Sequence, residues 1–225
     1  MSILGDPPGA EEVREARLFP LPDIVLFPGM RLPLHVFEPR YKTLVSDALA
    51  ADRMIAVVRL KPGYEEDYYG CPPVYAVCGI GRIVEHRRLH DGRFNILVEG
   101  SYRARLLGEL QTLPYRLNRV QVLGDRQSGH AAAVAALKQE LASLVRRLLP
   151  HLSPPVDALE RALSETSTAG ECADALAAML VSDPDARQEL LEQLDPLERM
   201  ARLISRMHEL LALAGVDRDA KSQLN

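Results

Sequence analysis

The period of the apolar residues changes near residue 123, and this change constrains the fold more than any other feature of the sequence. Before it, apolar residues form short runs such as 54–58 and 74–84, as in β-strands. After the Gly- and Ser-containing stretch 124–130, they recur at three- and four-residue steps, which is the period of an amphipathic helix. We therefore predict an α+β protein in which a β-domain is followed by an α-helical bundle.

The first half of the chain predicts several short strands and a single helix. Gly79 and Gly81 interrupt the run 74–84 and predict a bulge or a bend there. Asp91-Gly92 predicts a type I′ hairpin turn, and Pro39 predicts the first turn of the helix. Because crossover helices are few, we expect a mostly antiparallel sheet that curls into a barrel or a sandwich.

The stretch FPGMRLPLHVFEPRY, residues 27–41, places three prolines in an apolar run. Pro28-Gly29 predicts a turn after the strand-like residues 23–27. Pro33 predicts an edge strand or a bulge, because proline lacks the N–H that a central strand donates. The prolines and the glycine of this stretch are therefore expected mainly to set where strands end and where the helix begins. His35 is its one polar residue between Pro33 and Glu38, and a buried imidazole would need a hydrogen-bond partner.

The second half predicts several helices. A stripe of leucines within residues 137–148 indicates the first, and 156–163 and 168–181 predict two shorter ones. Asp183-Pro184 and Asp195-Pro196 each combine an N-cap acid with proline in the first turn, and so predict two further helix starts. The expected organisation is a flexible tail (1–16), a β-domain (17–124), a linker (125–130), a helical bundle (131–214) and a second flexible tail (215–225).

The composition is that of an ordinary globular protein, with 47% hydrophobic residues, 26% charged residues and a net charge of −4 over 225 residues. Residues 80–126 are locally basic, with nine arginines against five acids. These arginines either cover the solvent face of a sheet with their stems or bind phosphate. An aromatic content of 5% without Trp is low for a surface that stacks nucleic-acid bases.

The cysteines and the N-terminal sequence bear on location. Cys71, Cys78 and Cys172 are odd in number and lack CxxC spacing, which indicates a reducing compartment and no structural zinc. Cys78, inside a strand-like run, is expected to be a buried thiol. The N-terminus lacks a signal-peptide pattern, and no stretch approaches the ~18 apolar residues of a membrane span. We expect a cytoplasmic protein with no membrane partner.

The sequence contains no recognisable catalytic or cofactor motif. A P-loop needs GxxxxGK[ST], but none of the four lysines follows a glycine. No G-x-S-x-G nucleophile motif occurs, and no lysine has the context of a Ser–Lys dyad. The acids in residues 64–70 predict an exposed acidic and aromatic loop. Calcium or magnesium there is a minor alternative, because adjacent acids lack the spacing of a Ca²⁺ loop. We expect no enzyme, no cofactor and no metal.

Three stretches together resemble the Lon N-terminal domain family: residues 18–41 (LFPLPDIVLFPGMRLPLHVFEPRY), 82–106 (RIVEHRRLHDGRFNILVEGSYRARL) and 183–211 (DPDARQELLEQLDPLERMARLISRMHELL). The resemblance extends over residues 17–213. One departure is Cys78-Gly79, whose order is commonly reversed in the family. The family is the substrate-recognition module of the ATP-dependent Lon protease, and it also occurs as a stand-alone protein.

The resemblance implies a PUA-like, six-stranded β-domain with one packed helix, followed by a helical bundle. It also implies no catalysis, because the ATPase and the Ser–Lys protease of full-length Lon lie beyond this module. The implied partners are unfolded or damaged polypeptides. A separate protease and a second copy of the chain are further possible partners.

Two functions follow as hypotheses. The first is a polypeptide-binding or adaptor module that uses an apolar patch or a sheet edge. Its contact candidates are Phe27, Met30, His35 and Phe37. The alternative is an RNA-binding protein, because PUA relatives recognise RNA and residues 80–126 are basic; the acidic whole chain makes nucleic acid the less favoured partner. Its contact candidates are Arg82, Arg87, Arg88, Arg93, Arg103 and Arg105.

Overall fold

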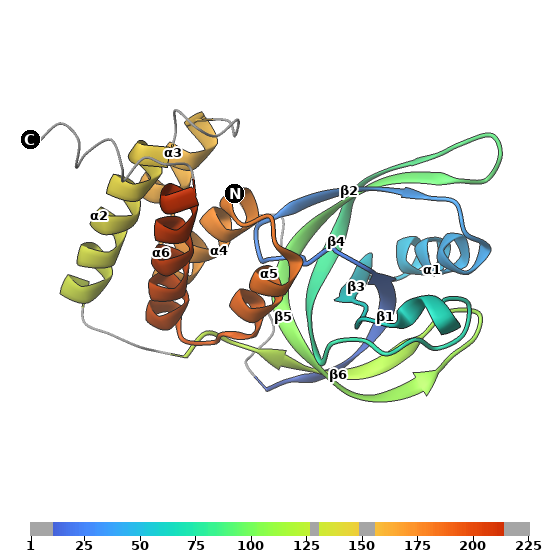
Figure 1. The fold of residues 1–225 in the computed structure, drawn as a ribbon. Helices are drawn as coiled ribbons and strands as arrows, with labels where there is room; N and C mark the ends of the chain where they lie inside the picture. The colour runs from blue at the N-terminus through green and yellow to red at the C-terminus, as the bar shows by residue number, and fades with distance from the viewer. Residues whose placement is uncertain (1–10, 127–130, 149–155, 214–225) are drawn as a thin grey trace, which may run out of the picture. The chain divides into compact units, whose positions relative to one another are not determined.

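The computed structural model describes residues 11–126, 131–148 and 156–213 (Figure 1). These residues form two compact units, and the division lies between Gly124 and Asp125. The first unit contains the strands and one α-helix, and the second contains the remaining helices. The expected flexible segment 215–225 lies outside the described residues.

The first unit is a six-stranded mixed sheet that closes on itself. Its order is β2-β5-β4-β3-β1-β6, and an additional β5–β6 pairing closes the last five strands into a ring. Only β1 and β3 pair in parallel, so the predicted mostly antiparallel α+β fold is confirmed. The strands are β1 (Val13–Leu21), β2 (Arg31–Val36), β3 (Met54–Arg59), β4 (Val77–Arg88), β5 (Phe94–Gln111) and β6 (Leu117–Leu123).

Strand β5 is long enough to serve two parts of the sheet. Its first residues lie between β2 and β4, and its later residues pair with β4 and β6. Register shifts occur between Ile80 and Gly81 and between Ile83 and Glu85, which confirms the irregularity predicted near the strand glycines. Such bulges bend a strand and increase its twist. They let one strand curve around the closed sheet.

Residues 22–30 cross the sheet without forming a strand, so the strand predicted for residues 23–27 is wrong. Val25, Leu26 and Phe27 are all buried. A Cβ built on Gly79 would lie 2.0 Å from the Leu26 carbonyl oxygen, and one on Gly100 would lie 2.0 Å from that of Phe27. The chain runs here against the sheet at a distance that only glycine permits.

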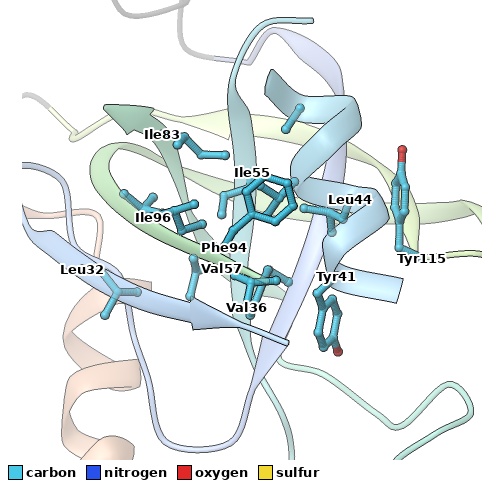
Figure 2. Close-up of a cluster of buried hydrophobic side chains, with 14 of the residues drawn as sticks. Leu32, Val36, Tyr41, Leu44, Ile55, Val57, Ile83, Phe94, Ile96 and Tyr115 are labelled. Atoms are coloured by element: carbon cyan, nitrogen blue, oxygen red, sulfur yellow. The ribbon is translucent and has the colours of Figure 1, made fainter. Parts of the chain in front are cut away.

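Helix α1 (Pro39–Ala50) begins at Pro39, as predicted, and covers one core cluster. Its stripe Tyr41, Leu44, Val45 and Ala48 is buried against strand residues such as Phe94. Figure 2 shows Leu44 of this helix beside Phe94 of the sheet. A second cluster, which includes Leu18, Val58 and Ile80, lies among the strands.

Two sequence predictions in this unit need correction. The expected tail 1–16 is too long, because Val13–Ala16 belong to β1 and pair with β6; residues 1–10 lie outside the described part. The turn at Asp91-Gly92 is not type I′, because only Gly92 has a positive φ, of 79°. Leu89 O accepts from Gly92 N at 3.0 Å, and Leu89 N donates to Arg93 O at 2.8 Å. The loop is a three-residue connection closed by a left-handed glycine.

Within its described residues, the second unit contains five α-helices: α2 (Ala131–Leu148), α3 (Val156–Ser164), α4 (Ala169–Leu180), α5 (Pro184–Glu192) and α6 (Pro196–Leu213). The predicted N-caps are confirmed. Asp183 accepts from the backbone N–H groups of Asp185 and Ala186, and Asp195 accepts from that of Leu197 at 2.9 Å. Thr168 and Glu171 form a capping box at α4.

An arginine of α6 is completely buried in this unit. The Arg199 guanidinium donates to Asp174 Oδ1 on α4 at 3.0 Å and also pairs with Asp125. A Cβ on Gly170 would collide with the Asp125 carboxylate, so the glycine makes room for it. Asp125 and Arg126, whose N–H donates to Leu194 O at 2.9 Å, are thus bonded to the bundle. The expected linker 125–130 is wrong for these two residues, and 127–130 lie outside the described part.

We predict that the glycines beneath residues 26 and 27 cannot carry a side chain. Gly79→Ala and Gly100→Ala should each lower the free energy of unfolding by about 3 kcal/mol or more, because the added methyl meets a backbone oxygen that cannot rotate away. Gly108→Ala, on the same β5 strand, meets nothing within 4 Å and is the matched control. Urea denaturation followed by circular dichroism measures the three variants. A Gly100→Ala variant as stable as Gly108→Ala would contradict this account.

We also predict unequal costs for two ion pairs of α6. Asp174→Ala leaves the Arg199 charge buried without its full set of partners, and should cost about 3 kcal/mol. Arg206→Ala removes an exposed pair with Glu209, 3.0 Å long, and should cost less than about 1 kcal/mol. Thermal melts followed at 222 nm compare the two. Equal melting temperatures would show that the buried network does not stabilise the bundle.

Candidate functional site

The four peptide-contact candidates separate into two buried or half-buried residues and two exposed ones. Phe27 is 0% exposed and belongs to the core, so its prediction as a contact is wrong. Met30 is half-buried and packs against the core cluster. His35 and Phe37 are exposed at the end of β2, where Phe37 retains 60% of its surface. Only these two are available to a partner.

His35 belongs to a small polar cluster at the end of β2 and the start of β5. Its Nδ1 lies 2.6 Å from Asn95 Oδ1, which makes Nδ1 the donor, and its Nε2 lies 3.3 Å from Arg93 Nη1. Its ring stacks near that of Phe37, with centroids 6.2 Å apart. Arg93 Nε also donates to Asp91 Oδ2 at 2.5 Å. The imidazole is therefore engaged on both nitrogens, although it is not buried.

The edge of β2 is a poor acceptor for an added strand. Among the described residues β2 pairs only with β5, which confirms the edge position predicted from Pro33. Met30 O accepts from Gly100 N, and backbone groups alternate in direction along a strand, so Pro33 presents its backbone to the open side. Proline lacks an N–H and interrupts the row of donors there. The open edge of β2 therefore offers an added strand an interrupted row of backbone donors.

The six arginine candidates do not form one basic surface. Arg103 is buried and Arg82 is half-buried, whereas the others are exposed. Arg93 pairs with Asp91, and Arg88 lies over the Phe94 ring, 5.8 Å from its centroid. The arrangement fits the interpretation that arginine stems cover the sheet. Two of the six candidates are thus withdrawn from the surface, and Arg87, Arg88, Arg93 and Arg105 stay exposed.

A groove in the same unit gathers side chains that the sequence did not single out together. Its buried floor consists of Leu18, Pro20, Tyr41 and Leu60. One wall is formed by residues 68–70 and Pro72, which follow the 3₁₀ helix η1 (Tyr64–Asp67), and the other by residues 112–116, between β5 and β6. Tyr69 and Leu113 retain 85% and 78% of their surface. We call this surface the tyrosine groove.

Arg40 contacts three tyrosine rings of the tyrosine groove. Its guanidinium carbon lies 4.8 Å from the ring centroid of Tyr41, 5.2 Å from that of Tyr68 and 5.8 Å from that of Tyr69. Arg40 Nε donates to Glu38 Oε2 at 3.0 Å, and Tyr68 Oη donates to Glu38 Oε1 at 2.9 Å. Cation–π contacts of this kind favour tyrosine faces turned toward the guanidinium. Helix α1 thereby holds one wall of the groove.

Hydrogen bonds connect the two walls with α1 and with each other. Tyr115 Oη donates to Asp47 Oδ2 of α1 at 2.8 Å. Arg116 Nη1 donates to the Pro72 carbonyl at 2.8 Å, and Arg116 Nε donates to Glu109 at 2.6 Å. The walls are loops, but they are bonded to rigid elements. Exposed apolar side chains in such a place are held toward solvent by the fold.

The tyrosine groove is open and not an enclosed pocket. The cavity volume of the groove is about 30 Å³, whereas small-molecule sites usually have several hundred Å³. Cys78 is buried, as predicted, and burial raises the pKa of its thiol to about 12, so it carries no thiolate at neutral pH. Among residues 11–126, 131–148 and 156–213, no three His, Cys, Asp or Glu side chains are placed to hold a metal ion.

Sequence reasoning described residues 64–70 as an exposed acidic and aromatic loop, and this description is correct as far as it goes. It missed residues 112–116, which line the same groove. The available signal was Leu113, an apolar residue between turn-like neighbours in TLP, which has no strand partner to bury it. Long-range pairing of two loops has no signature in the local pattern.

The described residues define a small α+β protein whose first unit carries the tyrosine groove. Residues 15–209 match the family described as the ATP-dependent protease La (LON) substrate-binding domain. The chain belongs to this family, as the resemblance predicted. No helix within the described ranges is long and apolar enough to cross a membrane.

Individual relatives agree with this assignment. The chain is 31% identical to Lon protease 2 of Myxococcus xanthus, over 92% of this chain and 26% of the relative. It is 32% identical to the Lon protease of Roseiflexus castenholzii, over 98% of this chain and 27% of the relative. The chain therefore spans about a quarter of the length of these curated relatives.

Two solved structures share the fold. A Lon N-terminal domain protein from Xanthomonas campestris aligns with a TM-score of 0.58 and 22% identity, over 85% of this chain and 98% of that one. The N-terminal domain of Mycobacterium avium complex Lon protease aligns with a TM-score of 0.63 and 18% identity, over 87% of this chain and 98% of that one.

We predict that one tyrosine of the groove floor titrates far above its usual value. Burial raises the pKa of Tyr41 to about 12, although the Arg40 charge opposes the shift. The chain lacks Trp, so phenolate absorbance can be followed directly. Tyr41→Phe should remove the group that ionises near pH 12. Because the folded state favours the neutral phenol, stability falls as pH rises from about 10 through 12, and the variant should lose less stability over that window.

The control for this titration is the circular dichroism spectrum at neutral pH, which should be the same for both proteins. If Tyr41→Phe instead removes a group that ionises near pH 10, the usual value for tyrosine, Tyr41 is not buried in solution.

Proposed function

We propose that this protein binds exposed segments of unfolded polypeptides in the tyrosine groove and has no catalytic role of its own. The proposal is supported by its family, whose description is that of a substrate-binding domain. The observation that carries it is the pair Tyr69 and Leu113, two large side chains that both line the groove and remain 85% and 78% exposed. A folded protein seldom gathers such side chains on its surface without a partner.

The shape of the groove fits an extended chain better than a small molecule. An extended segment can place alternate side chains against the groove while its backbone stays in water. The shallow groove, with a cavity volume of about 30 Å³, admits the tip of a side chain and little more. Such binding gains its free energy from apolar contact with Tyr69, Leu113 and Pro114, and needs no particular sequence.

Three further properties stay predictions: a separate protease as partner, self-association and a cytoplasmic location. RNA binding stays the alternative. Of its six candidate arginines, Arg103 is buried and Arg93 is paired with Asp91, which makes these two less accessible to phosphate. RNA affinity that falls steeply with salt would favour the alternative.

We predict that binding depends on the two exposed side chains of the groove. A fluorescent, reduced and carboxymethylated α-lactalbumin, which stays unfolded, serves as the probe in an anisotropy titration. Tyr69→Ala/Leu113→Ala should weaken its binding by about tenfold or more, because two apolar contacts are removed. Both side chains are exposed, so the double variant should fold like the wild type.

Two matched variants complete the experiment. Val13→Ala truncates an apolar side chain that is 54% exposed on β1, and it should leave binding unchanged. Phe37→Ala tests the other exposed aromatic, at the end of β2. A loss of affinity with Phe37→Ala and not with the groove variant would move the site to β2. Absence of binding by the wild type at high micromolar concentration would refute the function.

A further inference from the structure

Three acids directly precede the groove residues Tyr68, Tyr69 and Gly70 in the chain. Glu65, Glu66 and Asp67 occupy consecutive positions of η1, and all three are exposed. Glu65 and Glu66 form no ion pair with any residue that the structure describes. The Asp67 carboxylate lies against Gly70, which lines the groove, and accepts from Cys71 N at 3.0 Å. The Asp67 carboxylate is therefore held beside the groove, and Glu65 and Glu66 precede it in the same 3₁₀ helix.

The positive charges of the groove do not offset these acids, because each already has a carboxylate partner. Arg40 pairs with Glu38 at 3.0 Å, and Arg116 pairs with Glu109 at 2.6 Å. Across residues 61–76, a single lysine stands against three acids. The net field at this wall is negative, and it extends about a Debye length, ~10 Å, into solution at moderate salt.

The exposed ring beside these acids is itself suited to a cation. Arg40 approaches Tyr69 within 5.8 Å of the ring centroid, and Tyr68 meets it edge-on at 5.2 Å. These contacts leave 85% of the Tyr69 surface exposed. An arginine or a lysine of a partner can therefore stack on the exposed part of this ring, two residues beyond Asp67 in the chain.

We propose that the tyrosine groove selects extended polypeptide segments in which a Lys or Arg lies next to apolar residues. The apolar side chains contact Leu113 and Pro114, and the basic side chain contacts the Tyr69 ring beside Glu65 and Glu66. Acidic segments are repelled by the same charges. This inference rests on the proposed function and adds a chemical class to the ligand.

The test uses the full chain and peptides of equal length that share one Leu- and Phe-containing core. The peptides differ only at two flanking positions, which are Lys, Gln or Glu. At low ionic strength and neutral pH, the Lys peptide should bind about fivefold more tightly than the Gln peptide, and the Glu peptide more weakly than both. High salt should reduce the difference between the Lys and Gln peptides.

The variant Glu65→Gln/Glu66→Gln removes the unpaired charges and leaves Asp67, which supports the loop, in place. It should bind the Lys and Gln peptides within about twofold of each other, with affinity for the Gln peptide unchanged. A comparison with Glu11→Gln/Glu12→Gln, which removes two exposed acids at the start of the β1 region, controls for net charge.

The outcomes separate this inference from the function on which it rests. If the three peptides bind the wild type alike, or the Glu peptide binds most tightly, the charge selection is refuted while polypeptide binding stands. If the Glu65/Glu66 and Glu11/Glu12 variants lose the preference equally, only net charge acts and the groove is not the selective element. If no peptide binds, both the inference and the proposed function fail.

Discussion

The passage of residues 26 and 27 over Gly79 and Gly100 is the constraint on which the first unit depends. Their carbonyl oxygens lie where any Cβ would stand, at 2.0 Å from the built position. This contact fixes the crossing segment, and Gly29 and Met30 then bond to Gly100, at 2.8 Å each, and lead into β2. Helix α1 follows from β2, and Arg40 at its start holds the tyrosines of the groove. A shift of residues 26 and 27 away from the glycines would therefore also shift β2 and the start of α1, and with it Arg40 in the groove.

Local pattern was sufficient for most of the fold because the signals act over a few residues. The strand-to-helix change, the start of α1 at Pro39 and the N-caps at Asp183 and Asp195 depend on near neighbours, and all are confirmed. Residues 23–27 were mistaken for a strand because burial by the sheet demands the same apolar run as pairing within it. Gly92 was correctly placed in a turn, but the turn type depends on how the two strands twist into it.

The candidate site was predicted only in part, for a different reason. His35 and Phe37 are exposed, but Phe27, in the same stretch, is core, because β2 alternates its faces and the preceding segment crosses the sheet. The groove depends on residues 68–72 meeting residues 112–116, and no spacing rule connects loops so far apart in sequence. Arg199 shows the same limit: its burial follows from Asp125 and Asp174, which lie 74 and 25 residues away.

The two arginines that matter most in this chain illustrate how burial decides what a charge does. Arg199 is fully buried and forms ion pairs with two carboxylates. These pairs bond α6 to the rest of its own unit and leave the charge no access to a partner. Arg40 is only partly covered; it satisfies one carboxylate and spreads its remaining face over tyrosine rings. The first arrangement closes a core, whereas the second leaves rings in contact with water. In the function that we propose, such a groove makes weak, side-chain-sized contacts with a partner that is itself unfolded and offers many alternative segments.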